Sequence, residues 1–399
     1  MKLIRLHKIL SLFLIGLAIN SCTEPYALQP ESYEEAIVIE ATLTNEFKKQ
    51  EIKLSRTFRL EENGPSFESG ANVRVDDDMG NQYFFEEIDG KYVSSIEFQA
   101  VPNRVYQLHI STSDGKIYTS TNEKLSTINE MQDLVPTVAT IQGVRGVEIN
   151  AISFDPENTS KYYRYEYEES YKIIAPFWDP DKAIVIPPEE IELIPREGET
   201  KTCFSTEVSN TILQTTTAGL SEDRVRFPVR FISNQNAIIT HRYSILVRQY
   251  IQNLEAYTYY KTMKELSGSG SILSQNQPGF FSGNIRCENN PGEKTIGFFD
   301  VTSVSSKRIF FNYEDIFPGE PKPPYFDPCE IKIMEFCFNQ NNPDCKGGIL
   351  LNVINSNGLL YLDRFPKIPG GYYVYKMVAP PCGDCTSFSS NIKPAFWID

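Results

Sequence analysis

From Ala36 onward, apolar and polar residues alternate along the chain, a pattern typical of β-strands that bury one face. In the first run the odd positions from Ile37 to Leu43 are apolar, and the even positions from Val38 to Thr44 form a second, more polar face. Similar short runs follow as far as Ile117, separated by the turn-forming stretches "ENGPS", "DDDMGN", "IDGK" and "SDGK". We therefore predict an immunoglobulin-like or transthyretin-like β-sandwich over residues 36–125.

The run Asp76–Asn81 in this region allows two interpretations. Clustered carboxylates could bind calcium, because hard cations prefer oxygen ligands. The spacing of a helix-loop-helix calcium site is absent, however, and "MGN" is typical of a hairpin turn with a residue at positive φ. We favour the turn.

Residues 122–146 contain few large apolar residues, and we place the boundary of the first domain there. We predict a second, larger β-rich domain over residues 145–399, with strands in apolar runs such as "IITHRYSILVRQY", "GFFDVTSV" and "GILLNVI". Its one short helix spans residues 254–266, where Leu254, Tyr257, Met263 and Leu266 have helical spacing. Residues 175–200 are rich in Pro and Glu and suggest a long loop. The whole chain is thus predicted to be mainly β.

The stretch "KYYRYEYEES" places Tyr163, Tyr165 and Tyr167 on one face of a strand and Arg164, Glu166 and Glu168 on the other. An exposed row of tyrosines could bind a sugar or a peptide. Packing in a core is the more common role of such a row, and we favour it here.

The first 21 residues indicate an export signal. Three basic residues precede an apolar run from Ile9 to Ile19, which is too short for a permanent membrane span. Cys22 follows Ser21 at the end of this run, as in bacterial lipoprotein signals, so we predict that Cys22 is lipidated and becomes the first residue of the mature protein. The alternative is a secreted protein with Cys22 in a disulfide, which the even number of eight cysteines favours. Residues 22–35 are predicted to be a polar tether.

Charge and motifs limit the chemistry. The net charge is −14, which argues against nucleic acid as a partner. The sequence has three histidines, of which His7 leaves with the signal, and none of the common hydrolase, zinc-protease or nucleotide-binding motifs. We therefore assign no catalytic residue, no metal ligand and no cofactor, although paired carboxylates could still form a hydrolase site in space.

The remaining cysteines are the other candidates for chemistry. They are Cys203, Cys287, Cys329, Cys337, Cys345, Cys382 and Cys385. Cys382-Gly-Asp-Cys385 could be a redox dithiol or half of a zinc site, but an exported chain meets an oxidising compartment, and structural disulfides are the favoured interpretation. Many pairings are possible. We suggest Cys203 with Cys287, and the group from 329 to 345 with Cys382 and Cys385.

Several stretches together resemble one family over nearly the whole mature chain. They are "AIVIEATLTNE", "IKLSRT", "GLSEDRV", "YSILVRQY" followed by "EAYTYYK", "GNIRC", "GFFDVTSVSSKRIFF", "CGDC" and "KPAFW". The chain resembles a Bacteroidota lipoprotein family known as domain of unknown function 4249. The resemblance implies a lipid-anchored protein of the outer membrane, often encoded beside TonB-dependent receptors, on the cell surface or the periplasmic face. It implies no activity and supplies no catalytic residues.

Three hypotheses on function follow. The first is a non-enzymatic lipoprotein of the cell envelope that acts as an accessory or ligand-binding partner of a TonB-dependent outer-membrane transporter. The second is a surface adhesin or structural module, whose loops at residues 170–200 and 312–328 contact a polymer. The third is an enzyme, either a thiol–disulfide exchanger at Cys382 and Cys385 or a carboxylate hydrolase.

Overall fold

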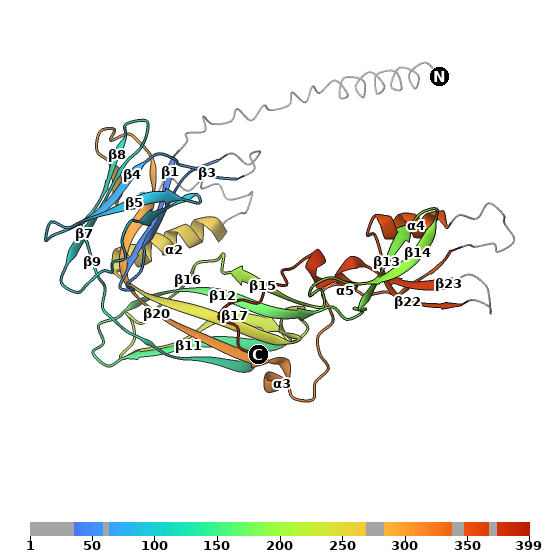
Figure 1. Ribbon diagram of the computed structural model, residues 1–399. Coiled ribbons are helices and arrows are strands. Elements are labelled where there is room, and N and C mark those ends of the chain that lie inside the picture. The colour runs from blue at the N-terminus through green and yellow to red at the C-terminus, as the bar shows by residue number, and fades with distance from the viewer. Residues whose placement is uncertain (1–35, 59–63, 269–282, 337–346, 367–372) are drawn as a thin grey trace, which may run out of the picture.

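The computed structural model describes residues 36–58, 64–268, 283–336, 347–366 and 373–399 and is mainly β, as predicted (Figure 1). Within these residues a 15-stranded sheet runs through the molecule, and smaller sheets pack beside it.

The N-terminal region is built from short strands whose alternate residues form one core. The strands are β1 (Ile37–Thr44), β2 (Glu51–Arg56), β3 (Ser66–Phe67), β4 (Asn72–Asp77), β5 (Gln82–Ile88), β6 (Lys91–Ser94), β7 (Val105–Ser111), β8 (Ile117–Ser120) and β9 (Glu123–Lys124). Ile37, Ile39, Ala41 and Leu43 are all buried there, as the alternation predicts.

Two strands from much later in the chain complete this region. β19 (Ile285–Cys287) pairs with β8, and the first half of β20 (Thr295–Asn312) pairs with β1 in parallel. The N-terminal core therefore includes Phe299 and Val301 of β20. Local alternation cannot show such pairing, because it depends on partners more than 160 residues away.

The second half of β20 belongs to the second region. It pairs with β18 (Arg242–Gln252), which continues the large sheet. The other strands of this part are β12 (Tyr162–Ile174), β15 (Thr202–Val208) and β16 (Leu213–Thr216). A second sheet of β10 (Met131–Ile141), β11 (Val144–Asp155) and β17 (Asp223–Ser233) packs against it, with the short helix η1 (Ala237–Ile239) near one end. Tyr163 and Tyr165 are buried between these sheets, so the tyrosine row of β12 is core.

A smaller unit projects from the far end of the second region, and we call it the arm (Figure 1). It contains a hairpin of β13 (Asp181–Ile186) and β14 (Glu190–Pro195) and a three-stranded sheet of β21 (Lys332–Glu335), β23 (Tyr373–Val378) and β22 (Leu360–Pro366). Its helices are α4 (Gly348–Asn355), α5 (Pro380–Gly383) and the short η2 (Cys385–Ser387), and α3 (Tyr313–Ile316) follows β20 in the body. The arm has its own apolar core, which includes Leu350 and Met377.

The arm corrects two predictions. Residues 175–200 are not only a loop, since they contain the β13–β14 hairpin. The run "GILLNVI", predicted as a strand, is helix α4, with Leu350, Leu351 and Ile354 on its buried side. A short apolar run fits either structure, and here the 3–4 residue spacing of the buried positions belongs to a helix.

The predicted helix is confirmed as α2 (Leu254–Gly268), but its buried face differs from the prediction. Leu254 is exposed, whereas Ala256 and Tyr259 are buried against Phe298 of β20, with Tyr260 and Met263 beside them. Helix α2 lies in the angle between the N-terminal region and the long strands (Figure 1).

Candidate functional site

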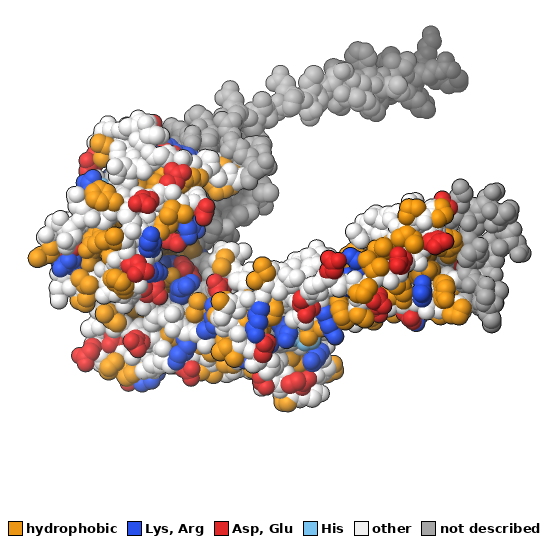
Figure 2. Space-filling model, viewed as in Figure 1, with side chains coloured by type: hydrophobic (Ala, Val, Ile, Leu, Met, Phe, Trp, Pro, Cys, Tyr) orange, Lys and Arg blue, Asp and Glu red, His pale blue; other side chains and the backbone are white. Residues whose placement is uncertain are grey.

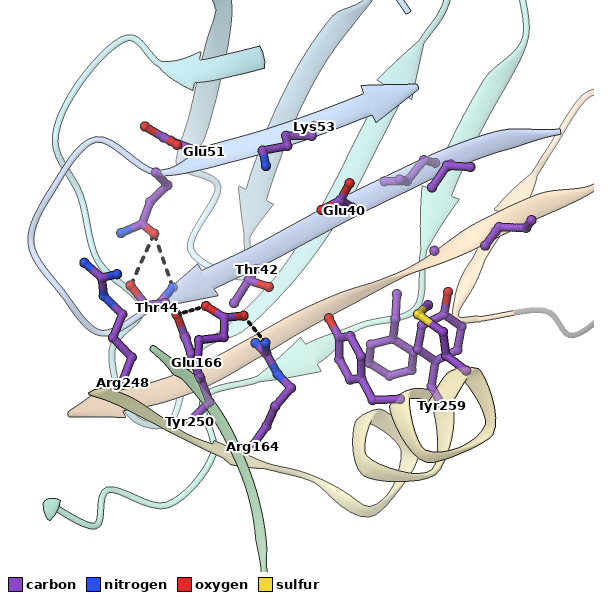
Figure 3. A pocket seen from close by; sticks show the side chains of 18 of the residues that line it. Glu40, Thr42, Thr44, Glu51, Lys53, Arg164, Glu166, Arg248, Tyr250 and Tyr259 are labelled. Carbon is purple, nitrogen blue, oxygen red and sulfur yellow. Dashed lines mark hydrogen bonds and ion pairs between the residues drawn. The ribbon is translucent and has the colours of Figure 1, made fainter. Parts of the chain in front are cut away.

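A hollow in the described residues lies where the large sheet bends beneath helix α2. It has a volume of about 630 Å³ and is lined by one face of consecutive strands, which contribute Arg164 and Glu166 (β12), Arg248 and Tyr250 (β18), Ile296 and Phe298 (β20), Val38, Glu40, Thr42 and Thr44 (β1), and Glu51 and Lys53 (β2). Tyr259, Tyr260 and Met263 of α2 close one side. We call this hollow the Arg164 groove (Figure 3).

Period-two alternation is what builds the groove. On β1 the odd residues enter the core, so Glu40 and Thr42 must face the groove. On β12 the tyrosines enter the core, so Arg164 and Glu166 face the same hollow. The groove is thus the polar side of strands whose other side is buried.

Arg164 is the central charged group of the groove. The residue is only 7% exposed, and its guanidinium lies 4.2 Å from the ring centroid of Tyr250 and 4.8 Å from that of Tyr260. Its Nη1 donates to Glu166, and the hydroxyl of Tyr250 donates to Oε2 of Glu166 at 2.9 Å (Figure 3). Stacking on two aromatic rings suits arginine, whose guanidinium is planar and less strongly hydrated than an ammonium group.

The Nε–H of Arg164 has no hydrogen-bond partner within the part of the chain that the structure describes. A buried donor without a partner costs roughly 1–3 kcal/mol, so this arrangement would be stabilised by an acceptor from a ligand. Burial raises the pKa of Glu166, but the neighbouring charge of Arg164 outweighs it and keeps that pKa below its ordinary value. The pair therefore stays ionised.

Asp300 of β20 is buried close to this pair. It is 1% exposed and accepts a hydrogen bond from Nε2 of Gln252 at 3.1 Å, while its Oδ1 has no partner among the described residues. Burial raises the pKa of Asp300 to about 6, and the charge of Arg164 only partly opposes that rise. Arg164 thus sits near two carboxyl groups of different acidity.

The groove carries more basic than acidic side chains, in contrast to the acidic chain as a whole. Five basic residues line it (Lys48, Lys49, Lys53, Arg164 and Arg248) against three acidic ones (Glu40, Glu51 and Glu166). Glu51 is already paired with Lys91 at 2.6 Å, whereas Lys49, Lys53 and Arg248 have no ion pair in the described ranges. Figure 2 shows basic side chains among acidic ones on the concave side of the bend.

Two glycines allow the strands to approach under α2. A Cβ on Gly297 would lie 2.4 Å from the carbonyl oxygen of Ile39, and one on Gly283 would lie 1.6 Å from the carbonyl oxygen of Gly297. Neither distance is possible for a side chain, so both positions need glycine.

The predicted disulfide residues are partly brought together. Cys203 pairs with Cys385, and Cys329 pairs with Cys382, so the two cysteines of "CGDC" do not pair with each other. The suggested Cys203–Cys287 pair is wrong, because Cys287 is a buried free thiol on β19 in the N-terminal core, far from β15. Cys22, Cys337 and Cys345 lie outside the described residues.

The other candidates for chemistry are dispersed. Nε2 of His109 lies 3.4 Å from Oδ2 of Asp76 on the N-terminal sheet, whereas His241 precedes β18, where burial lowers its pKa to about 4. The run at Asp76 is a turn, in which Oδ1 of Asp77 accepts from the backbone N–H groups of Met79 and Asn81. No group of three or more His, Cys, Asp or Glu side chains in the described ranges could hold a metal ion.

The sequence reasoning missed the Arg164 groove as a site. The signal was present, because Arg164 and Glu166 were assigned to the face opposite the tyrosines. What the pattern within one strand lacks is the identity of its neighbours in space, strand β18 and helix α2, which supply Tyr250 and Tyr260.

A family model described as a domain of unknown function, DUF4249, matches residues 23–308, which include every residue that lines the groove. A search of curated proteins found no match. No helix in the described part of the chain is long and apolar enough to cross a membrane.

Proposed function

The chain belongs to the DUF4249 family, and we propose that it is a non-enzymatic lipoprotein of the cell envelope that binds an anionic ligand in the Arg164 groove. The observation that carries this proposal is the buried, ring-stacked Arg164, whose Nε–H has no partner among the described residues. The excess of basic over acidic side chains in the groove lining supports a negatively charged ligand. The size of the groove is within the range of roughly 300–1,000 Å³ that is common for small-molecule sites.

The aromatic rings in the groove indicate that the ligand also has an apolar part. Tyr250, Tyr260 and Phe298 offer apolar surface beside the charges. A ligand that carries acidic groups on a partly apolar frame, such as an acidic oligosaccharide or peptide, would use both kinds of contact.

A comparison of acidic ligands with neutral counterparts tests the proposed binding of an anion in the Arg164 groove. Full-length protein in nanodiscs would be titrated by calorimetry with tetragalacturonate, tetraglutamate and citrate, and with neutral tetragalactose and tetraglutamine. We expect saturable binding of an acidic member of the panel, weakened about tenfold by Arg248→Gln and by added salt. Arg224→Gln, which removes an exposed arginine of β17, is the matched control. Equal binding of a neutral partner, or no acidic ligand bound, would contradict the proposal.

We further propose that the lipoprotein is anchored in the outer membrane through Cys22 and works with a TonB-dependent β-barrel transporter. This part rests on the resemblance of the sequence to envelope lipoproteins and on the lipoprotein-type ending of residues 19–22. Extraction of native membranes with a mild detergent, followed by affinity purification, should recover a β-barrel receptor together with this protein. Recovery of this protein alone would contradict the partnership.

A further inference from the structure

The "CGDC" motif lies beside a second hollow, at the base of the arm. This hollow has a volume of about 460 Å³ and lies between the β13–β14 hairpin, α4, β22 and the segment that contains η2. Arg196, Asp384 and Thr386 supply its polar side. We call it the arm pocket. It is separate from the Arg164 groove, with which it shares no lining residue.

Arg196 is held rigidly in this pocket. Its side chain is 6% exposed, its Nε donates to the backbone oxygen of Asp179 at 3.0 Å, and its Nη1 donates to Oδ2 of Asp384 at 3.1 Å. Asp384 is fixed in turn, because its Oδ1 accepts from the backbone N–H of Thr386 at 2.9 Å and because Cys382 and Cys385 on either side are both in disulfides. The motif therefore positions a carboxylate that orients Arg196.

The Nη2 group of Arg196 is buried without a hydrogen-bond partner in the described residues. Leaving the Nη2 donor of a rigid, charged guanidinium without an acceptor lowers the stability of the folded protein, and a ligand that supplies an acceptor would remove that cost. Lys182 also lines the pocket and has no ion pair in the described ranges. With Arg196 and Lys182 against Asp384, the lining has a net charge of about +1, which suits a single negative charge better than a dianion.

The pocket also has an apolar lining. Ile184, Val185, Leu360 and Tyr361 all contribute to it. We propose that the arm pocket binds a small monoanionic carboxylate with an apolar body, whose carboxylate accepts from Nη2 of Arg196 and whose body lies against Ile184 and Leu360.

Three related probes test the chemistry. Full-length protein in nanodiscs would be titrated with 4-phenylbutyrate, neutral 4-phenylbutanol and cationic 4-phenylbutylamine, with empty nanodiscs as the blank. We expect saturable binding of the carboxylate at millimolar concentration, at least about tenfold tighter than of the alcohol or the amine. Absence of saturable binding of the carboxylate, or equal binding of the alcohol, would overturn the proposal.

Variants of residues that line the arm pocket test whether the carboxylate probe binds there. The double change Arg196→Gln with Asp384→Asn removes both charges of the pair and should weaken binding at least about tenfold. Ile184→Trp adds bulk to the lining of the pocket and leaves both charges of the pair in place. It should have a similar effect, which keeps the test decisive if the double variant does not fold. Arg224→Gln is the control and should bind as the unchanged protein does. Unchanged binding in folded Ile184→Trp would overturn the assignment to this pocket.

Discussion

Asp300 is a buried carboxyl group, and burial raises its pKa from 3.8 to about 6. A raised pKa means that the folded state binds the proton more tightly than the unfolded state does. Ionisation of Asp300 therefore lowers the free energy of unfolding. This loss is absent below about pH 4, grows as the pH rises, and is complete above about pH 6. The shift corresponds to at most roughly 3 kcal/mol. Asp300→Asn should raise the free energy of unfolding at neutral pH by up to that amount and leave it nearly unchanged at pH 4, as measured by urea denaturation.

Asp155 provides a control of opposite sign. Burial raises its pKa, but hydrogen bonds from the backbone N–H groups of Ser160, Thr159 and Glu157 outweigh burial and lower it to about 2. Asp155→Asn should therefore destabilise the protein at neutral pH, and this loss should shrink as the pH falls from about 4 to 2. If Asp300→Asn also destabilises the protein at neutral pH, Asp300 is not a strained carboxylate.

Single residues differ in how far the sequence alone predicts them. The burial of Tyr163 and Tyr165 follows from alternation within one strand. The free thiol of Cys287 does not, because its surroundings depend on the pairing of β19 with a strand more than 150 residues earlier. The same reason explains why Arg164 was placed on the correct face without its aromatic neighbours being known.

Among the elements, β20 joins the two regions, and Gly297 allows it to lie against β1. In Gly297→Ala the new Cβ would meet the carbonyl oxygen and the Cβ of Ile39 at 2.4 and 2.9 Å. Relief requires the parallel pairing of β1 and β20 to shift, so we expect a loss of about 2–4 kcal/mol in the free energy of unfolding. Gly219→Ala is the control, since nothing lies within 4 Å of its Cβ. Equal stability of the two variants would show that β1 and β20 tolerate the change.

The Cys329–Cys382 disulfide ties the arm to itself at its base and spans 53 residues. In the chain-entropy model a loop of that length contributes about 4 kcal/mol. The double change Cys329→Ala with Cys382→Ala should loosen the arm and leave the N-terminal core intact. Hydrogen exchange should thus become faster in β22 and β23 and stay unchanged in β1 and β4. Faster exchange throughout would contradict an independent arm.

Elements also show where a sequence pattern is ambiguous. Helix α2 was predicted in the right place because its apolar residues have helical spacing and a glycine-rich stretch follows it. Helix α4 was predicted as a strand, because "GILLNVI" is apolar at almost every position and has no polar face to show its period. Only its packing against β13 and the arm core selects the helix.

For the whole molecule, the prediction that matters most is the anchor at Cys22. If the proposal is right, Cys22→Ser should move the protein from the detergent phase to the aqueous phase in a phase-partition assay, because several acyl chains hold a protein far more firmly than one does. Cys287→Ser is the matched control. Cys287 is a buried thiol in the N-terminal core, so this variant should stay in the detergent phase. Intact-mass measurement of the membrane-extracted protein should give a chain that begins at Cys22 and carries acyl groups. A mass without acyl groups, or one that retains residues before Cys22, would exclude the anchor and with it the proposed place of this protein in the outer membrane.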